Sequence, residues 1–366
     1  MQKSTLLLII DNLEKGGAEV LLTGILPDLN KKFKVILVML TGECDFTKEE
    51  IQCKKKYSLG FKNKFYLLSC SWKLKKIIKK ENPSIIHSHL FYSSLIARLA
   101  CPSSIPLVYS LHGEMSKNVF NNSKVLTFLE KKTIKKNHVV MAVSNTVLKD
   151  YKKTITNNIN SLVLKNYISN KYFSQKKNEK GYKRLRKLKL IAVGNIKNTK
   201  NYSYLVSAFT YLKDFEVSLD VYGNGNAADF EILENEIEKN NSAIIFKGPV
   251  NNIHELLPDY DLYVSCSKHE GFGIAAVEAM ALGLPLILTD LPVYHEVTFN
   301  NALFFDIRNP ASFAELIKEI FEGKHDLNNL SVKGNCLAKK YTKEIYLNNL
   351  FSIYDKMLNN SNRPDK

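Results

Sequence analysis

The sequence has few of the features that mark secreted or membrane-spanning proteins. Its 366 residues contain only six cysteines, and these form no C-x-x-C pair and no cluster with histidine at zinc-ligand spacing. The longest apolar stretch, 273–289, is interrupted by Glu278 and Pro285, so we expect a buried helix and strand there, not a membrane span. The apolar run 6–10 is too short for a signal peptide. These features predict a cytoplasmic protein with free thiols.

Acidic residues are scarce in the first half of the chain. Residues 1–189 contain 36 basic and 13 acidic residues, whereas residues 190–366 contain 16 and 23. A basic surface favours nucleic acid, anionic lipid or phosphorylated small molecules as partners. No zinc finger, aromatic RNA-binding signature or arginine-rich readout helix is present, so a nucleic-acid partner is not expected. A Lys-rich genome is the alternative explanation, although it should affect both halves alike.

The length of the chain fits two domains. Short β-branched or Leu-rich runs alternate with helical periodicity in both halves, which predicts the α/β class with two doubly wound parallel sheets. We expect an N-terminal domain at 1–167, a Lys-rich linker at 168–188 and a C-terminal domain at 189–341, with a last helix at about 342–366 packing on the first domain. The expected strands are 5–10, 34–40, 84–87, 107–110, 139–143, 190–193, 217–222, 244–246, 262–265, 285–288 and 302–305. Ligands of such sheets bind at the carboxyl ends of the strands, so a cleft facing both sheets is expected.

The segment 269–279, HEGFGIAAVEA, carries the strongest chemical signal. A predicted strand runs through Gly271 and Gly273 into a helix, and a helix N-terminus presents unpaired N–H groups that suit a diphosphate. Glu270 precedes the helix, while Glu278 lies inside it among apolar residues. A buried carboxylate requires hydrogen-bond donors, and a ribose diol supplies them. The alternative is that Glu278 is a partly exposed helix residue without function.

This segment resembles the E-x7-E signature of glycosyltransferase family 4, whose members are retaining enzymes with the two-domain GT-B fold. Three further segments resemble the family in order and spacing. They are KGGAE at 15–19, VGN at 193–195 followed by Lys200-Asn201, and the run from Gly283-x-Pro285 through Thr289-Asp290 to Glu296-Val297. The resemblance covers nearly the whole chain and is of the bacterial surface-polysaccharide type.

The resemblance implies roles for individual residues. Glu270 would contact hydroxyls of the donor sugar, Glu278 would bind the ribose, and His112 would lie near the reacting sugar. The catalytic set is then His112, Glu270 and Lys200. The donor-binding set is Gly16, Gly17, Asn195, Lys200, the backbone amides of Gly271, Phe272, Gly273 and Ile274, and Glu278.

Two departures from the family pattern concern phosphate and donor binding. Asn195 stands where the family usually has arginine, so one of two phosphate-neutralising cations is missing unless Lys197 replaces it. The family's common Gly-Gly before Glu296 is replaced by LPVYH at 291–295. We expect the second departure to affect which donor fits.

The implied reaction needs no cofactor and no metal. Cleavage of the sugar–phosphate bond places negative charge on the leaving diphosphate, and preorganised donors such as Lys200 and a helix N-terminus stabilise that charge. Asp259-Tyr260-Asp261 has the D-x-D form of metal-dependent transferases but precedes a buried strand, so we expect it to be structural. His87 and His89 are expected to point to opposite faces of a strand and so to make a poor metal pair. Gly223-Asn224-Gly225 is expected to be a strand-to-helix turn above the donor site.

Two predicted helices combine lysines with apolar and aromatic residues. The first carries Trp72, Leu74, Ile77 and Ile78 among Lys73, Lys75, Lys76, Lys79 and Lys80, and the second carries Val125, Leu126, Phe128 and Leu129 with Lys131, Lys132, Lys135 and Lys136. Such helices suit an anionic bilayer surface. Ordinary helices that bury their apolar residues and expose their lysines are the alternative.

The sequence therefore predicts a retaining, metal-independent glycosyltransferase of the hexosyltransferase class. Its donor would be a nucleotide-diphosphate sugar, a UDP-sugar in our interpretation. Its acceptor would be a polyprenyl-linked or growing surface glycan such as capsule, O-antigen or lipooligosaccharide. Its place would be peripheral, on the inner face of the cytoplasmic membrane. The alternatives are a nucleotide-sugar epimerase of the same fold and a non-catalytic sugar-nucleotide-binding subunit.

Overall fold

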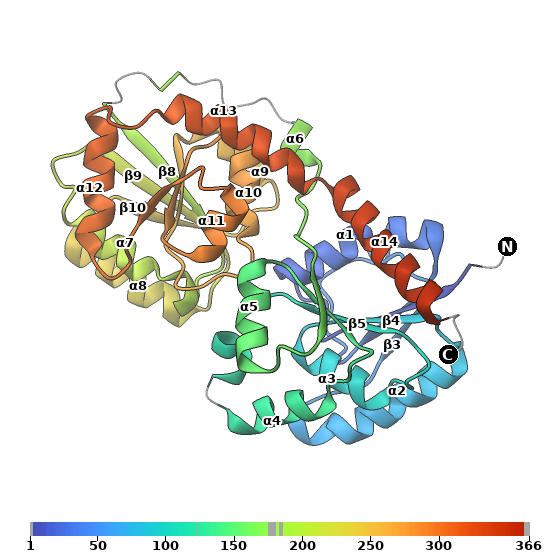
Figure 1. Ribbon diagram of the computed structural model, residues 1–366. Coiled ribbons are helices and arrows are strands. Elements are labelled where there is room, and N and C mark those ends of the chain that lie inside the picture. Colours follow the sequence, from blue (N-terminus) through green and yellow to red (C-terminus); the bar gives the residue numbers. More distant parts are fainter. Residues whose placement is uncertain (1–2, 122, 175–180, 183–185, 362–366) are drawn as a thin grey trace. The chain divides into compact units, whose positions relative to one another are not determined.

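The computed structural model describes residues 3–121, 123–174, 181–182 and 186–361 (Figure 1). The chain divides into two compact units. Unit 1 consists of Met1–Tyr167 with Glu344–Lys366, and unit 2 consists of Ile168–Lys343. The described part of the predicted linker belongs to unit 2, whereas its residues 175–180 and 183–185 lie outside the described residues, as do residues 362–366 of the predicted last helix.

Unit 1 is built on a seven-stranded parallel sheet with the strand order β3-β2-β1-β4-β5-β6-β7. The order reverses direction between β1 and its second neighbour β4, which is the switch point where doubly wound sheets bind ligands. The strands are β1 Thr5–Ile10, β2 Lys34–Met39, β3 Lys55–Ser58, β4 Ile85–His89, β5 Leu107–Leu111, β6 Val139–Ala142 and β7 Asn160–Val163.

Alternate side chains of β1 enter two different cores, because successive strand residues point to opposite faces. Leu6 and Leu8 pack with helix α1 and the C-terminal helix α14, while Leu7 and Ile9 pack with α2 and α3. Both faces of this sheet are therefore covered by helices (Figure 1). The helices of unit 1 are α1 Gly17–Lys32, α2 Leu67–Glu81, α3 Phe91–Ala100, α4 Lys124–Thr133, α5 Asn145–Thr154 and α14 Lys343–Ser361, with short turns η1 Lys64–Tyr66 and η2 Ser116–Phe120.

Unit 2 repeats this topology with a six-stranded parallel sheet of order β10-β9-β8-β11-β12-β13. Its switch point lies between β8 and β11. The strands are β8 Leu188–Val193, β9 Val217–Tyr222, β10 Ile244–Gly248, β11 Leu262–Ser265, β12 Leu286–Thr289 and β13 Leu303–Phe305. The helices and helical turns are α6 Lys171–Ser174, η3 Asn198–Lys200, α7 Tyr202–Phe209, α8 Ala227–Asn240, α9 Ile253–Leu256, η4 Leu257–Asp259, α10 Ile274–Ala281, α11 Pro292–Thr298, α12 Pro310–Phe321, α13 Leu327–Ala338 and η5 Lys339–Tyr341.

The predicted α/β class with two doubly wound parallel sheets is confirmed. The sequence interpretation missed β3 and β7, which close the two edges of the first sheet. Their sequences, KKYS and NSLV, have no buried residue, so they lack the apolar pattern that reveals a central strand. Within the described residues, no helix is long and apolar enough to cross a membrane.

Candidate active site

The E-x7-E segment follows β11 and forms a turn that only glycine can complete. Gly273 is the N-cap of α10 and has a left-handed φ of 79°, a conformation that residues with a Cβ rarely adopt. A Cβ on Gly273 would lie 2.6 Å from Cε1 of the buried Tyr294. The Tyr294 hydroxyl is in turn 2.6 Å from Oγ of Ser265, the last residue of β11. The aromatic ring thus fixes the turn at the start of the helix.

Lys200 and Glu270, which are seventy positions apart in the sequence, form an ion pair in this unit. Nζ of Lys200 donates a hydrogen bond to Oε1 of Glu270, and Oγ of Ser267 donates to the same oxygen at 3.0 Å. The two side chains are 27% and 16% exposed, so the pair is accessible to a ligand. β8 and β11 are neighbours in the sheet, and the segments that follow them bring the cation and the carboxylate together.

Glu278 lies on α10 in a partly buried environment that favours its protonated form. Burial raises the pKa of its carboxyl group from 4.5 to about 7, while a hydrogen bond from the Tyr172 hydroxyl acts in the opposite direction. Tyr172 is buried and belongs to α6, within the segment that we interpreted as a linker. This contact could not be predicted from the sequence, because a single tyrosine in a Lys-rich segment has no periodicity to reveal it. The group is poised to exchange its proton for donors from a ligand.

Asn195 binds a neighbouring turn. Its Oδ1 accepts a hydrogen bond of 3.2 Å from the backbone N–H of Asn224. Gly223, beside it, approaches so closely that a Cβ would lie 2.1 Å from the carbonyl oxygen of Gly194. The turn at 223–225 therefore lies directly against the turn that leads to Lys200. Lys197, the possible replacement for the missing arginine, is exposed.

The remaining predicted donor-binding residues of unit 2 lie at the start of α10. Phe272 is buried, and its ring centroid lies 5.4 Å from that of Tyr341. Ile274 is the first residue of the helix, and the partly buried Gly271 precedes Phe272. The structure therefore groups these residues with Glu270 at a helix N-terminus, where backbone N–H groups favour an anion.

His112, Gly16 and Gly17 belong to unit 1. Gly16 is the N-cap of α1 and Gly17 its first residue, after β1. A Cβ on Gly16 would lie 2.4 Å from Oε2 of Glu19, so glycine leaves room for that buried carboxylate. His112 follows β5, and its Nε2 lies 3.2 Å from Nδ1 of His89.

The prediction that His87 and His89 point to opposite faces of a strand is wrong. Their ring centroids are 4.1 Å apart, because residues two apart in a strand share a face. Both histidines are buried next to His112, a cluster that the sequence interpretation missed although the i, i+2 spacing indicates it.

Asp261 has a structural partner in the described structure. Its Oδ2 accepts a hydrogen bond of 2.8 Å from the backbone N–H of Lys189, which ties the segment before β11 to β8. Across the described ranges, no group of three or more His, Cys, Asp and Glu side chains is arranged to hold a metal ion.

Two family models match the chain. Residues 15–159 match the model described as Glycosyltransferase Family 4, and residues 173–335 match the model described as Glycosyl transferases group 1. The matched regions contain every predicted site residue.

Three curated relatives are 25–28% identical to this chain. N-acetyl-alpha-D-glucosaminyl L-malate synthase of Bacillus anthracis is 28% identical over 61% of this chain, and the match spans 61% of its own length. The O-antigen chain mannosyltransferase RfbU of Salmonella typhimurium is 27% identical over 58% of this chain and 63% of its own length. The capsular polysaccharide biosynthesis glycosyltransferase CapH of Staphylococcus aureus is 25% identical over 93% of this chain and 97% of its own.

Solved structures share the fold. Anabaena Alr3699/HepE in complex with UDP matches with a TM-score of 0.81 at 16% identity, covering 96% of this chain and 100% of that one. The lipopolysaccharide outer core galactosyltransferase WaaB matches with a TM-score of 0.76 at 15% identity, covering 96% and 99%. Both the fold and the two family models lead to one assignment: the chain has the GT-B fold and belongs to the glycosyltransferases of group 1, family 4.

Proposed function

We propose that this chain is a retaining glycosyltransferase that moves a sugar from a UDP-sugar to a lipid-linked or growing surface glycan. The observation that carries the proposal is the Lys200–Glu270 pair in front of the N-terminus of α10. A cation and a row of backbone amides suit a diphosphate, and the adjacent carboxylate suits sugar hydroxyls. Glu278, in the second turn of α10, binds the ribose hydroxyls.

Related proteins support the proposed donor and acceptor. HepE is described in complexes with UDP and with UDP-glucose, which supports uridine as the donor nucleoside. RfbU, CapH and WaaB are described as acting in O-antigen, capsule and lipopolysaccharide synthesis. These names support a surface glycan as the acceptor.

The mechanism follows from where charge develops. The bond between the anomeric carbon and the diphosphate breaks, and negative charge accumulates on the leaving oxygen. Lys200 and the α10 amides stabilise that charge, and such preorganised donors contribute several kcal/mol to catalysis. The acceptor hydroxyl attacks from the face that the diphosphate leaves, and its proton passes to the leaving phosphate. Glu270 holds hydroxyls of the donor sugar, and His112 donates a hydrogen bond to the same sugar.

The pairing of Lys200 with Glu270 also explains how the donor-free site is kept stable. Each charge has an opposite partner until the donor binds, so neither is left uncompensated in a partly buried place. The diphosphate then shares the lysine, and the sugar hydroxyls become donors to the carboxylate. No metal is needed to neutralise the diphosphate in this arrangement.

We further propose that α2 and α4 of unit 1 dock on an anionic membrane surface. Along η1 and α2, Phe65, Leu68 and Trp72 are 84%, 77% and 60% exposed. Lys76 Nζ lies 3.4 Å from the centroid of the Trp72 ring. Exposed aromatic side chains next to lysines suit the headgroup region, where aromatic rings insert and lysines meet phosphates.

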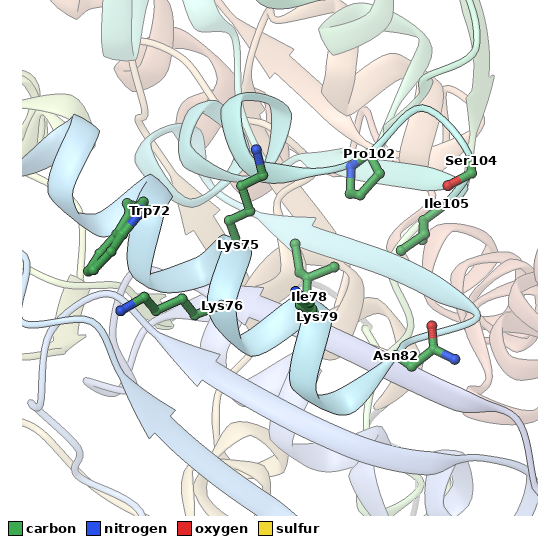
Figure 2. Close-up of a pocket in the computed structure, with 9 residues that line it drawn as sticks. All are labelled: Trp72, Lys75, Lys76, Ile78, Lys79, Asn82, Pro102, Ser104 and Ile105. Carbon is green, nitrogen blue, oxygen red and sulfur yellow. The ribbon is translucent and has the colours of Figure 1, made fainter.

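A cavity of about 520 Å³ lies on the same surface. Figure 2 shows the side chains that line it, which come from α2, from Asn82 directly after it, and from the segment between α3 and β5. Its lining combines Lys75, Lys76 and Lys79 with Trp72, Ile78, Asn82, Pro102, Ser104 and Ile105. A lining that combines three cations with apolar side chains suits an amphiphile with an anionic head.

Helix α4 also exposes apolar side chains. Its buried side is anchored by Glu130, which accepts hydrogen bonds from Arg98 and from the Tyr151 hydroxyl. Val125 and Phe128 are exposed. Exposed apolar side chains therefore lie on this helix together with the exposed Lys124, Lys131 and Lys132, a combination that suits an anionic bilayer surface.

A donor panel tests the function directly. Nucleotide sugars that differ in base and sugar are compared by thermal shift, where a ligand at 100 times its Kd stabilises the protein by about 2.7 kcal/mol. We expect UDP-sugars to raise the Tm and GDP- or dTDP-sugars to leave it unchanged. The stabilising donor is then incubated with and without a polyprenyl-linked glycan. Conversion of the sugar without an acceptor would identify an epimerase instead, and no stabilisation by any donor would contradict the proposed site.

A further inference from the structure

Three histidines form a continuous row in unit 1. His87 and His89 lie on β4, and His112 follows the adjacent strand β5. The ring centroids of His87 and His89 are 4.1 Å apart, and those of His89 and His112 are 5.4 Å apart. The predicted site includes only His112, and it assigns no role to His87 or His89.

His87 is fixed at both ring nitrogens. Its Nδ1 lies 2.6 Å from the hydroxyl of Tyr354 on α14, and its Nε2 lies 2.8 Å from Oγ of Ser110. The His87 ring packs against the His89 ring in a tilted arrangement, with an interplanar angle of 34°. The orientation of the buried His89 ring is therefore constrained by a ring that cannot itself rotate without breaking two hydrogen bonds.

His89 contacts His112 through one nitrogen only. Its Nδ1 lies 3.2 Å from Nε2 of His112, while its Nε2 is buried and has no hydrogen-bond partner among the described residues. A neutral imidazole carries its proton on one nitrogen and accepts at the other. If Nε2 of His89 carried the proton, a buried N–H would have no acceptor, which is a costly arrangement. The favoured arrangement puts the proton on Nδ1, where it is donated to His112.

All three rings are expected to be neutral at physiological pH. Burial lowers the pKa of His87 to about 3 and that of His112 to about 4, and it holds the pKa of His89 well below its usual value. A single proton therefore lies between His89 and His112. The ring that carries this proton determines the tautomer of both rings.

We propose that His89 is a positioning residue that donates its Nδ1–H to Nε2 of His112 and so keeps the His112 proton on Nδ1. His112 is partly exposed, and this tautomer presents an N–H donor to a substrate oxygen where the other tautomer presents a lone pair. The inference rests on the proposed function, in which His112 meets the donor sugar. His87 and Tyr354 act through His89 by holding its ring plane.

Two substitutions separate the hydrogen bond from packing. His89→Asn places an amide that can donate from nearly the same position as Nδ1, whereas His89→Leu fills similar space without a donor. We expect His89→Leu to lower kcat about tenfold with less than a twofold change in donor KM, the scale of one hydrogen bond. His89→Asn should stay within about threefold of the wild type. Thermal unfolding of both variants shows whether the fold is intact, and equal losses in both would overturn the proposal.

A double-mutant cycle excludes a merely structural effect. In a His112→Ala background, His89→Leu should cost no further activity, because the group that it orients is absent. If the fold-losses in activity of the two single variants multiply in the double variant, the positioning role is overturned. Full activity of His112→Ala alone would instead remove His112 from the proposed active site, which is a failure of the proposed function and is distinguishable on that ground.

Nitrogen NMR of the full chain with ¹⁵N-labelled histidine determines the tautomer of His112 and requires no activity assay. The His112 signals are assigned from their loss in His112→Ala. We expect the proton on Nδ1 in the wild type and in His89→Asn, and a mixture of tautomers in His89→Leu. A wild-type His112 with its proton on Nε2 would overturn the proposal.

Discussion

At the scale of single residues, the most specific chemical roles that we propose are those of Lys200 and Glu270. Each lies within hydrogen-bond reach of the other, and in our proposal each meets a different part of the donor. Lys200→Ala and Glu270→Ala should therefore each lower kcat at least about 100-fold, which corresponds to about 2.7 kcal/mol of lost transition-state stabilisation. Steady-state assays with the donor found by the panel measure this effect.

The control for these variants is Lys239→Ala, which removes an exposed lysine from the last turn of α8. It should leave kcat within about twofold of the wild type. Circular dichroism and Tm show whether the folds are preserved. Wild-type turnover in a folded Lys200→Ala or Glu270→Ala variant would refute the assignment of that residue.

The raised pKa of Glu278 predicts that donor binding depends on pH. Its pKa is raised to about 7 by burial, and ribose hydroxyls would bind the ionised carboxylate. Binding then releases a proton below pH 7, so the affinity for a nucleotide sugar should rise about tenfold between pH 6 and pH 8. In Glu278→Gln the profile should be flat over this range. Isothermal titration calorimetry measures both, and a wild-type profile that is already flat would contradict the ribose role.

The same group makes a separate prediction for the stability of the donor-free protein. A carboxyl whose pKa is higher in the folded than in the unfolded state favours folding while it is protonated. That contribution is fully present below about pH 4.5 and is lost as the pH rises through about 7. The free energy of unfolding of Glu278→Gln should lack this component, which urea titrations at pH 5 and pH 8 would show by comparison with the wild type.

At the scale of elements, our proposal gives the N-terminus of α10 and Lys200 of η3 the role that a metal has in other transferases. The carboxylate of Asp261 accepts a backbone hydrogen bond from Lys189, which is a structural role. We therefore expect activity to persist in excess EDTA. Loss of activity that Mg²⁺ or Mn²⁺ restores would show that the D-x-D sequence at 259–261 was wrongly dismissed.

At the scale of the whole molecule, the two units differ in charge. Unit 1 contains 30 basic and 15 acidic residues, whereas unit 2 contains 22 and 21. Each lysine near an anionic bilayer contributes about 1 kcal/mol, screened over about 8 Å at physiological ionic strength. The protein should therefore co-sediment with anionic liposomes much better than with neutral ones, and added salt should weaken this binding steeply.

A matched pair of variants locates this binding. Changing Lys75, Lys76, Lys79 and Lys80 to Gln should weaken liposome binding at least about tenfold at low salt and leave donor affinity unchanged. The control removes the same charge from exposed positions of unit 2, by changing Lys213, Lys239, Lys333 and Lys339 to Gln, and should bind like the wild type. Equal losses in the two variants would assign the effect to net charge alone and not to the surface of α2.

The sequence by itself determined the class of the fold and the local chemistry. The alternation of apolar strands and periodic helices, the glycines at 271 and 273 between a strand and a helix, and the E-x7-E spacing are properties of neighbouring residues, and such patterns can be recognised without coordinates. Tertiary structure decided which distant groups meet. It paired Lys200 with Glu270, joined Tyr172 to Glu278, placed His112 next to His89 and left Phe128 exposed. These contacts depend on strand order and on which helix face is buried, and both are set by packing of the whole unit rather than by local spacing.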